Sequence, residues 1–289
     1  MADMKYPNLF KGRTAVFTTK HKKESVVFPI LSKAGIHLKL VDSIDTDLFG
    51  TFTGEVLRSG TQVEAARLKA LKAIEQTGET LALASEGSFG PHPTLYFVPA
   101  NVELVLLLDS TNQIELHGWE ISIDTNYAHQ KVKSVDEALD FGNRIGFPSH
   151  GLVVRPNSGS GKSDLLFKGV VSESELIYAV EKCIKYSEDM NAMIETDMRA
   201  MCNPKRMTVI ENAASNLLNI MNSLCPQCNW PGFDVTEKVS GLPCELCGSP
   251  TRATLSHIYI CKKCSFKNEI EFPGGKTSED PTYCDWCNP

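Results

Sequence analysis

Four pairs of cysteines constrain this chain more than any other feature of its sequence. Each pair has the spacing Cys-x-x-Cys, and all four lie between residues 225 and 289. A Cys-x-x-Cys sequence forms a tight turn that places its two thiolates on the same side. Two such turns together supply the four ligands of a tetrahedral zinc site. The sequence therefore predicts a double zinc-ribbon module at 225–289 that holds two structural Zn²⁺ ions. Its eight predicted ligands are Cys225, Cys228, Cys244, Cys247, Cys261, Cys264, Cys284 and Cys287.

The spacing leaves the pairing of the four turns open. The stretches between successive pairs contain 15, 13 and 19 residues, and all three lengths are compatible with a β-ribbon. The second and third pairs could form a self-contained ribbon, which would leave the first and fourth pairs to form the other site. Sequential pairing, in which the first pair joins the second, is equally simple. The two remaining cysteines, Cys183 and Cys202, lie in helical-looking sequence and are expected to be core or incidental thiols.

The composition is that of a globular protein without a membrane span. Of the 289 residues 42% are hydrophobic and 22% are charged, which supports one substantial core plus a smaller module. The net charge of −6 provides no basic field that would attract nucleic acid or anionic lipid. No apolar run approaches the roughly 18 residues of a membrane span, and residues 1–13 lack the apolar core of a signal peptide. We therefore expect a cytoplasmic protein, whose oligomeric state the sequence does not predict.

The apolar pattern predicts a mixed-sheet α/β domain at 1–171 and a helical extension at 172–224. The first strand, helix and strand form a βαβ unit, which implies parallel pairing, whereas two later strands around the turn 110–113 form an antiparallel pair. The predicted strands are 14–19, 36–41, 81–84, 102–108, 114–123, 151–155 and 165–171. The predicted helices are 25–34, 61–76, 134–145, 172–200 and 207–224.

The stretch Leu81–Pro93, LALASEGSFGPHP, is the strongest candidate for a site in the α/β domain. Its first four residues predict a buried strand, and the Gly- and Pro-rich remainder predicts a loop. Ser85, Glu86, Ser88 and His92 would then lie at the carboxyl end of a strand, where open α/β sheets bind their ligands. A structural turn with a solvated Glu86 is the alternative.

Two further segments carry charges that such a site could use. The basic segment 20–24, with His21 and Lys23, follows the first predicted strand, where anions are commonly held. Asp45 and Asp47 lie in an irregular acidic segment, and carboxylates this close together favour a divalent cation such as Mg²⁺ or Mn²⁺. Solvation in surface loops would explain both segments equally.

Two resemblances extend this interpretation. The segment 61–70, followed by Thr77-Gly78 and a strand into Glu86-Gly87, resembles the central motif of the inosine-triphosphatase/Maf-like nucleotide pyrophosphatases. Residues 18–23 are similar to the Thr-Asn-x-x-Lys turn of that superfamily. The chain departs from the superfamily at Lys20, which replaces the Asn of the turn, and at Ala84 and Ser85, which replace the paired aspartates of one branch.

The pyrophosphatase resemblance implies specific roles. Lys23 and Lys69 would contact phosphate, Glu64 would support the metal, and Glu86 would match the acidic residue of the superfamily's EGG or DDSG loop. The whole chain also resembles an uncharacterised bacterial family of unknown function, which implies an architecture but no activity. The strings that carry this second resemblance are 19–24, 45–52, ASEGSFGPHP, FPSHG at 147–151 and the terminal Cys-Asn-Pro.

Two functional hypotheses follow. The first is a metal-dependent hydrolase of nucleotides or other phosphorylated small molecules. Its metal would be held among Asp45, Asp47, Glu64 and Glu86, with Glu86 or His92 as general base, and phosphate would contact Lys23, Lys69, His21, Ser85 and Ser88. The second is a non-catalytic protein whose zinc module recognises nucleic acid or a protein while the α/β domain senses a ligand. Residues 225–289 contain six Lys or Arg and eight Asp or Glu, which disfavours non-specific nucleic-acid binding.

Overall fold

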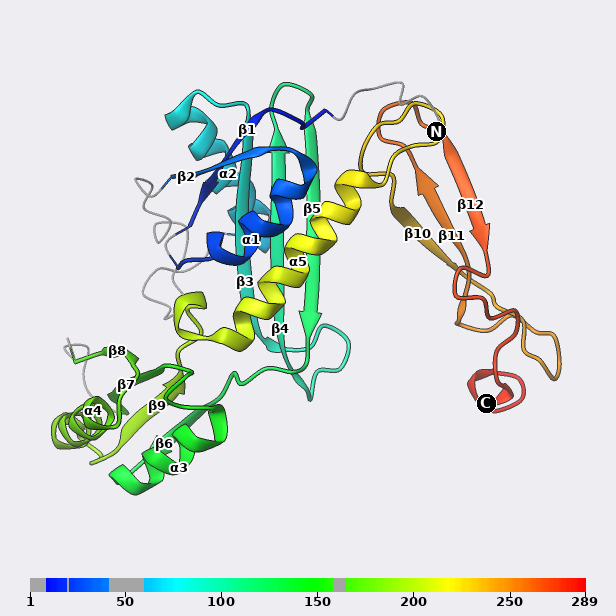
Figure 1. Cartoon of the computed structure of the whole chain (residues 1–289). Coiled ribbons are helices and arrows are strands. Elements are labelled where there is room, and N and C mark those ends of the chain that lie inside the picture. The colour runs from blue at the N-terminus through cyan, green and yellow to red at the C-terminus, as the bar shows by residue number, and fades with distance from the viewer. Residues whose placement is uncertain (1–8, 20, 42–59, 158–164) are drawn as a thin grey trace. The chain divides into compact units, whose positions relative to one another are not determined.

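The computed structural model describes residues 9–19, 21–41, 60–157 and 165–289 (Figure 1). The chain forms two compact units, one of Gly12–Leu218 and one of Asn219–Pro289 together with Met1–Lys11. The first unit carries the α/β sheets and the second carries all eight paired cysteines. Within the described residues, no helix combines the length and apolar character needed to cross a bilayer.

The larger sheet of the α/β unit is mixed, as the sequence predicts. Its strands, in the order in which they pair, are β2 (His37–Val41), β1 (Thr14–Thr18), β3 (Leu81–Pro91), β4 (Pro99–Asp109) and β5 (Ile114–Ser122). The first three are parallel to one another, and β3, β4 and β5 are antiparallel. The predicted βαβ unit and the predicted antiparallel pair are both confirmed.

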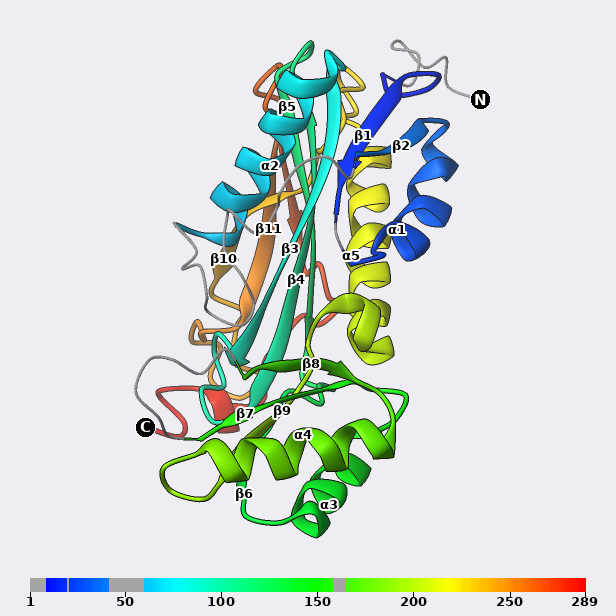
Figure 2. The ribbon, with the colours of Figure 1, turned by 90° about the vertical axis from the view of Figure 1, so that its left-hand side faces the viewer.

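Helices cover both faces of this sheet (Figure 2). The helix α2 (Gln62–Thr77) lies on one face, and α1 (Glu24–Leu31) and α5 (Pro204–Asn222) lie on the other. The α2 face uses small side chains, since Ala66, Ala70 and Ala73 pack against the sheet and let the helix approach closely. A Thr61–Glu64 capping box begins α2, and Gly78 ends it in a left-handed conformation.

Strand β3 is longer than the sequence predicts. The loop expected from Ser85 onward is wrong, because β3 continues to Pro91 and pairs residue by residue with β4. A Cβ atom at Gly87 would lie closer than 3.0 Å to the side chains of Glu103 and Arg206. Gly87 therefore serves close packing rather than a turn. The turn begins only at His92, whose backbone N–H donates to Val98 O.

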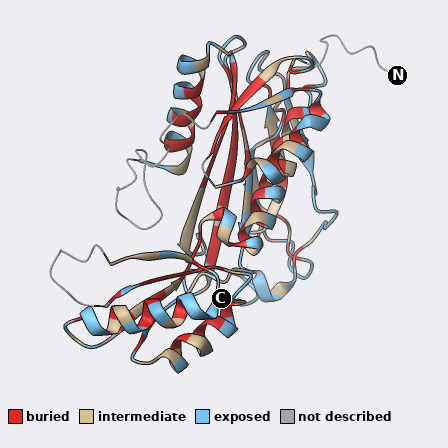
Figure 3. Ribbon diagram, turned by 60° about the vertical axis from the view of Figure 1, so that its left-hand side comes forward, coloured by how far each residue is buried: buried red, intermediate tan, exposed pale blue. Residues whose placement is uncertain are grey.

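A second, smaller sheet belongs to the same unit. It is antiparallel, and its strands in pairing order are β6 (His129–Val132), β9 (Ala192–Thr196), β7 (Leu152–Pro156) and β8 (Phe167–Val170). The helices α3 (Val135–Ile145) and α4 (Glu173–Tyr186) share its hydrophobic core. The helix predicted over 172–200 is wrong beyond Tyr186, because the alternating burial of 192–196 belongs to β9. Figure 3 shows buried residues along the inner faces of the helices and the central strands.

The cysteine-rich unit is built on a three-stranded antiparallel sheet. Its strands, in chain order and in pairing order, are β10 (Val235–Ser240), β11 (Thr254–Ile260) and β12 (Lys267–Glu271). The remaining helical elements of the described chain are short 3₁₀ turns at Ser32–Ala34, Ala200–Cys202 and Pro281–Tyr283. The predicted fold class, a mixed α/β protein with a carboxyl-terminal double zinc-ribbon module, is confirmed.

Candidate metal centres and a buried charge cluster

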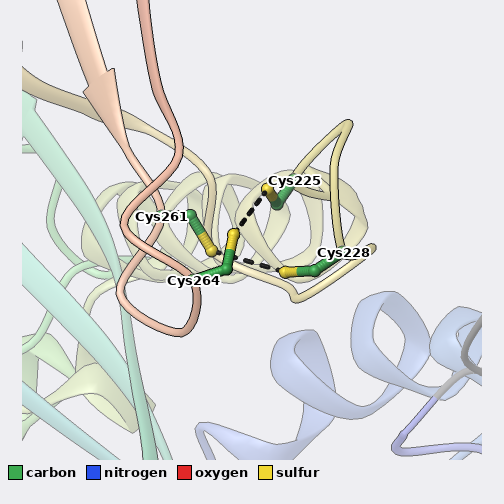
Figure 4. A group of neighbouring side chains, drawn as sticks. All are labelled: Cys225, Cys228, Cys261 and Cys264. Carbon is green, nitrogen blue, oxygen red and sulfur yellow. Dashed lines mark hydrogen bonds between the residues drawn. The ribbon is translucent and has the colours of Figure 1, made fainter.

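The eight paired cysteines form two clusters of four. The first cluster joins the first and third pairs, Cys225/Cys228 and Cys261/Cys264 (Figure 4). The second joins Cys244/Cys247 to Cys284/Cys287. In each cluster the four Sγ atoms lie within 4.8 Å of one another.

The sulfur positions fit zinc. The Sγ–Sγ distances are 3.8 Å for Cys225–Cys264 and 3.6 Å for Cys228–Cys261 in the first cluster, and 3.8 and 3.7 Å for the corresponding contacts in the second. A tetrahedron with Zn–S bonds of about 2.3 Å has S–S edges of about 3.8 Å. A disulfide would require about 2.05 Å. The donor set and its geometry therefore suit one Zn²⁺ ion in each cluster.

All four turns close in the same way. The backbone N–H of the residue after the second cysteine donates to the carbonyl oxygen of the first, at 2.7–2.9 Å in every turn. The donors are Asn229, Gly248, Ser265 and Asn288. Three of them, Asn229, Gly248 and Ser265, have positive φ angles, which glycine adopts freely and which asparagine tolerates better than most residues. The hydrogen bond from the residue after each pair therefore closes the turn that places both sulfurs on one side.

Both pairings considered from the sequence are wrong, because the two sites are interleaved along the chain. The antiparallel β10–β11 hairpin brings the residues before β10 beside those after β11, so the first cysteine pair meets the third. The β11–β12 hairpin likewise places the end of β12 beside the start of β11. The fourth pair follows β12 and the second pair precedes β11, so these two pairs meet. The two clusters consequently lie at opposite ends of the sheet. A three-stranded antiparallel arrangement, with one cysteine pair before the first strand, one in each connection and one after the last strand, is the signal that predicts this pairing.

The two clusters differ in their surroundings. The first shares a small hydrophobic core with four aromatic residues, and Cys225 and Cys261 are buried in it. The ring of Phe233 lies 5.5 Å from that of Tyr259 and 5.9 Å from that of Phe266, measured between centroids. The second cluster also has two buried cysteines, Cys244 and Cys284, but among the described residues it has no comparable aromatic core, and its Cys247 and Cys287 are exposed, whereas Cys228 and Cys264 of the first cluster are half-buried.

The two unpaired cysteines are not part of either cluster. Cys183 lies in the core of the smaller sheet, where burial raises the pKa of its thiol to about 12. Burial also raises the pKa of Cys202. Both are protonated, unreactive thiols at neutral pH, as expected of core cysteines.

Four of the predicted site residues of the α/β unit come together in a buried charge cluster. Lys23 Nζ donates to Ser85 Oγ at 3.0 Å, and Lys69 Nζ forms an ion pair with Glu86 Oε1 at 2.5 Å. All four residues are less than 9% exposed. Lys23 lies at the start of α1 and Lys69 on α2, so the two opposite faces of the sheet each contribute a lysine to neighbouring residues of β3.

The charge cluster lies at the topological switch point of the sheet. The chain leaves β1 in one direction to reach β2 and crosses back to place β3 on the other side of β1. Pairing between β1 and β3 ends at Phe17 and Leu83, whereas β3 runs on past Ser85 and Glu86 with β4 alone. Open α/β sheets bind ligands at this position, at the carboxyl ends of the strands on either side of the switch point.

A second ion pair in the same region was not predicted from the sequence. Arg206 on α5 donates from Nε to Glu103 Oε1 at 2.8 Å and from Nη2 to Oε2 at 3.3 Å, and its guanidinium stacks on the Phe89 ring at 4.9 Å. Both charged residues are almost fully buried. Glu103 interrupts the apolar run of β4, which is the only sequence signal for this pair, because its partner is 103 residues away.

Of the two lysines in the charge cluster, Lys69 forms an ion pair with a carboxylate and Lys23 forms none within the described residues. Within the described residues its Nζ has Ser85 as its hydrogen-bond partner and no ion-pair partner. The pKa of Lys23 is lowered to about 7: burial is the largest cause, the charges of Arg206 and Lys69 act in the same direction, and the charges of Glu103 and Glu86 partly oppose them. Lys23 is therefore partly deprotonated at neutral pH.

Other predicted residues do not join the cluster. Glu64 caps α2, where hydrogen bonds from Thr61 lower the pKa of its carboxyl. The Nδ1 atom of His92 accepts N–H groups within its own turn. Ser88 donates to Gln62 Oε1, and the His21 backbone N–H donates to Thr19 Oγ1. Asp45 and Asp47 lie outside the described residues. Over the described ranges, only the two cysteine clusters have the geometry of a metal site, and nothing supports Mg²⁺ or Mn²⁺.

Comparison with known families gives a match over most of the chain. A family described as a domain of unknown function, DUF6671, matches residues 69–289. The chain belongs to the DUF6671 family. The matched region includes Lys69, Ser85, Glu86, Arg206 and all eight paired cysteines, whereas Lys23 precedes it. No curated protein matches the chain. The expected membership of a family of unknown function is thus confirmed, and the comparisons return nothing that links the chain to the Maf-like pyrophosphatases.

Proposed function

We propose that this DUF6671 protein is a zinc-stabilised binding protein whose α/β unit takes a small anionic molecule at the carboxyl ends of β1 and β3. The observation that carries the proposal is the buried Lys23 without a carboxylate partner. Burying a lone ammonium is unfavourable, and a ligand phosphate or carboxylate beside it would remove the penalty.

The charges around Lys23 support an anion rather than a cation. Glu86 already pairs with Lys69, and Glu103 already pairs with Arg206. A protonated Lys23 therefore leaves these five groups with a net charge of +1. Thr18 Oγ1, at the end of β1, adds a buried polar atom without a hydrogen-bond partner in the described part of the chain. A ligand that reaches the carboxyl end of β1 would satisfy the Thr18 hydroxyl as well.

The metal-dependent hydrolase hypothesis has less support. It requires carboxylates that converge on a divalent cation, but Glu86 is held by Lys69 and Glu64 by the start of its own helix. Binding is therefore the function that the arrangement favours. A phosphate-release screen with Mg²⁺ or Mn²⁺ separates the two hypotheses, since turnover that disappears in Glu86→Gln would favour hydrolysis.

Calorimetry of the zinc-loaded full chain with inorganic phosphate, nucleotides and citrate tests binding directly. An anion beside Lys23 raises its pKa from about 7, so binding above pH 7 should take up a proton and weaken as the pH rises. Lys23→Met should abolish both binding and proton uptake. Lys72→Met, which removes an exposed lysine paired with Glu75, is the matched control and should change neither. Unchanged affinity in Lys23→Met, or no binding across the panel, would refute the proposal.

A further inference from the structure

The second cysteine cluster exposes three large apolar or aromatic side chains. Leu246 is 73% exposed, Tyr283 69% and Trp286 78%. Each of them immediately precedes a cysteine of this cluster, namely Cys247, Cys284 or Cys287. The sulfurs of these cysteines lie within 4.8 Å of one another, so the two turns that carry the three side chains meet at the cluster. We call Leu246, Tyr283 and Trp286 the apolar surface of the second cluster.

The first cluster shows that zinc binding does not require this exposure. Its turns carry Gln227 and Lys263 at the positions that correspond to Leu246 and Trp286. Its aromatic residues pack into the core around the sulfurs, and the Lys263 ammonium lies 4.7 Å from the Trp230 ring centroid. The same turn therefore folds with polar residues at these positions. Leu246 and Trp286 occupy equivalent exposed positions in the two turns of the second cluster. Because the fold does not require apolar side chains there, we infer that they serve a contact with another molecule.

The charges beside the apolar surface are mostly negative. Glu245 and Asp285 lie within the two turns. Glu279 and Asp280 lie near Lys276, and these two carboxylates together with Glu245 raise the pKa of the Lys276 ammonium. Two cations oppose these four carboxylates, since Arg252 pairs with Asp285 and Lys276 with Glu279. A zinc ion held by four thiolates would add a charge of about −2.

From this arrangement we propose that the second cluster docks a segment of a partner protein in which lysine or arginine flanks apolar residues. Trp, Tyr and Leu supply a contact surface in which aromatic residues commonly dominate the binding energy, and the acidic surroundings select a basic partner. Nucleic acid is disfavoured because both cations named here, Arg252 and Lys276, already pair with carboxylates and are outnumbered by them, which leaves little positive charge to neutralise phosphates. A second copy of this chain is disfavoured because it would bring the same acidic turns together. The proposal is independent of the anion site in the α/β unit.

Selection from a random peptide library on the zinc-loaded full chain tests the proposal. Peptides with two or more Lys or Arg around an apolar centre should be enriched, and their affinity should fall as salt rises. The double variant Leu246→Ala/Trp286→Ala should weaken the enriched peptides by tenfold or more. Tyr96→Ala/Phe97→Ala, which removes two exposed aromatic residues of the α/β unit, is the matched control and should leave the affinity unchanged.

The variants are informative because they alter exposed side chains, so the double variant should keep two zinc ions and an unchanged unfolding temperature. Enrichment of acidic or uncharged peptides, no enrichment, or equal binding to the double variant would overturn the proposal. Sedimentation of the wild type supplies one more outcome. Self-association that the double variant abolishes would assign the surface to a second copy of the chain and would also overturn the proposal.

Discussion

The two cysteine clusters have the same ligands, the same spacing and the same turn, and each has two buried cysteines, but the residues around them differ. The first is enclosed by Trp230, Phe233, Tyr259 and Phe266, so its sulfurs are part of a hydrophobic core. The second leaves Cys247 and Cys287 exposed and surrounds them with solvent-facing side chains. The ligand set therefore fixes the metal, whereas the residues inside and beside each turn set how far the site is buried.

Removal of one ligand from each cluster should have the largest and most unequal effects. Cys261→Ser takes a buried ligand from the first cluster and opens its core, so the β10–β12 sheet should unfold and both zinc ions should be lost. Cys247→Ser takes an exposed ligand from the second cluster, so one zinc ion should be lost while the sheet persists. Native mass spectrometry and circular dichroism measure the two results. Equal loss of zinc and structure in the two variants would remove the distinction between the clusters.

Truncation of one aromatic residue beside each cluster should give the next largest difference. Phe233 is only 9% exposed and contacts two other rings, so Phe233→Ala should lower the free energy of unfolding by about 3–5 kcal/mol. Trp286 is exposed, and Trp286→Ala should change the free energy of unfolding by less than about 0.5 kcal/mol. Denaturant unfolding of the zinc-loaded variants gives both values. A large destabilisation by Trp286→Ala would mean that the second cluster also has a supporting core.

The variant Lys23→Met changes the α/β unit and should leave both cysteine clusters unchanged, so it serves as the reference for the variants above. The folded-state pKa of Lys23, about 7, lies below its value of 10.5 in the unfolded chain. Wild-type stability should therefore rise as the pH rises from about 7 towards 10.5, because the unfolded state then binds more protons. Lys23→Met should remove this dependence and raise the unfolding temperature at pH 7 by about 2–4 °C or more. Both zinc ions should remain bound, and their loss would show that the clusters depend on the α/β unit.

Local signals in the sequence predicted much of the fold. The capping residues Thr61, Ser134 and Ser172 begin α2, α3 and α4 where the sequence places these helices, and each accepts a hydrogen bond from the third residue of its helix. The eight cysteine ligands were identifiable from spacing alone. These features depend on neighbours within four residues, which is the range over which a sequence can be interpreted without knowledge of the fold.

Features that depend on distant neighbours were missed. Ser85 to Pro91 forms a strand because β4 provides a partner along its whole length, despite two glycines that favour a loop. The pairing of the cysteines follows from the order of β10, β11 and β12, which spacing does not reveal. The Glu103–Arg206 ion pair joins residues that only the packing of α5 on the sheet brings together. Lys23 and Ser85 were predicted as site residues, but their direct hydrogen bond was not.

The rate of zinc release to a chelator tests most directly the claim that the two clusters have different roles. We expect two phases of one ion each: a fast phase from the second cluster and a slow phase that follows unfolding of the first. Cys247→Ser should remove the fast phase and leave the slow phase unchanged. Release of both ions in a single phase, or a fast phase that survives in Cys247→Ser, would show that the two clusters do not differ in this way.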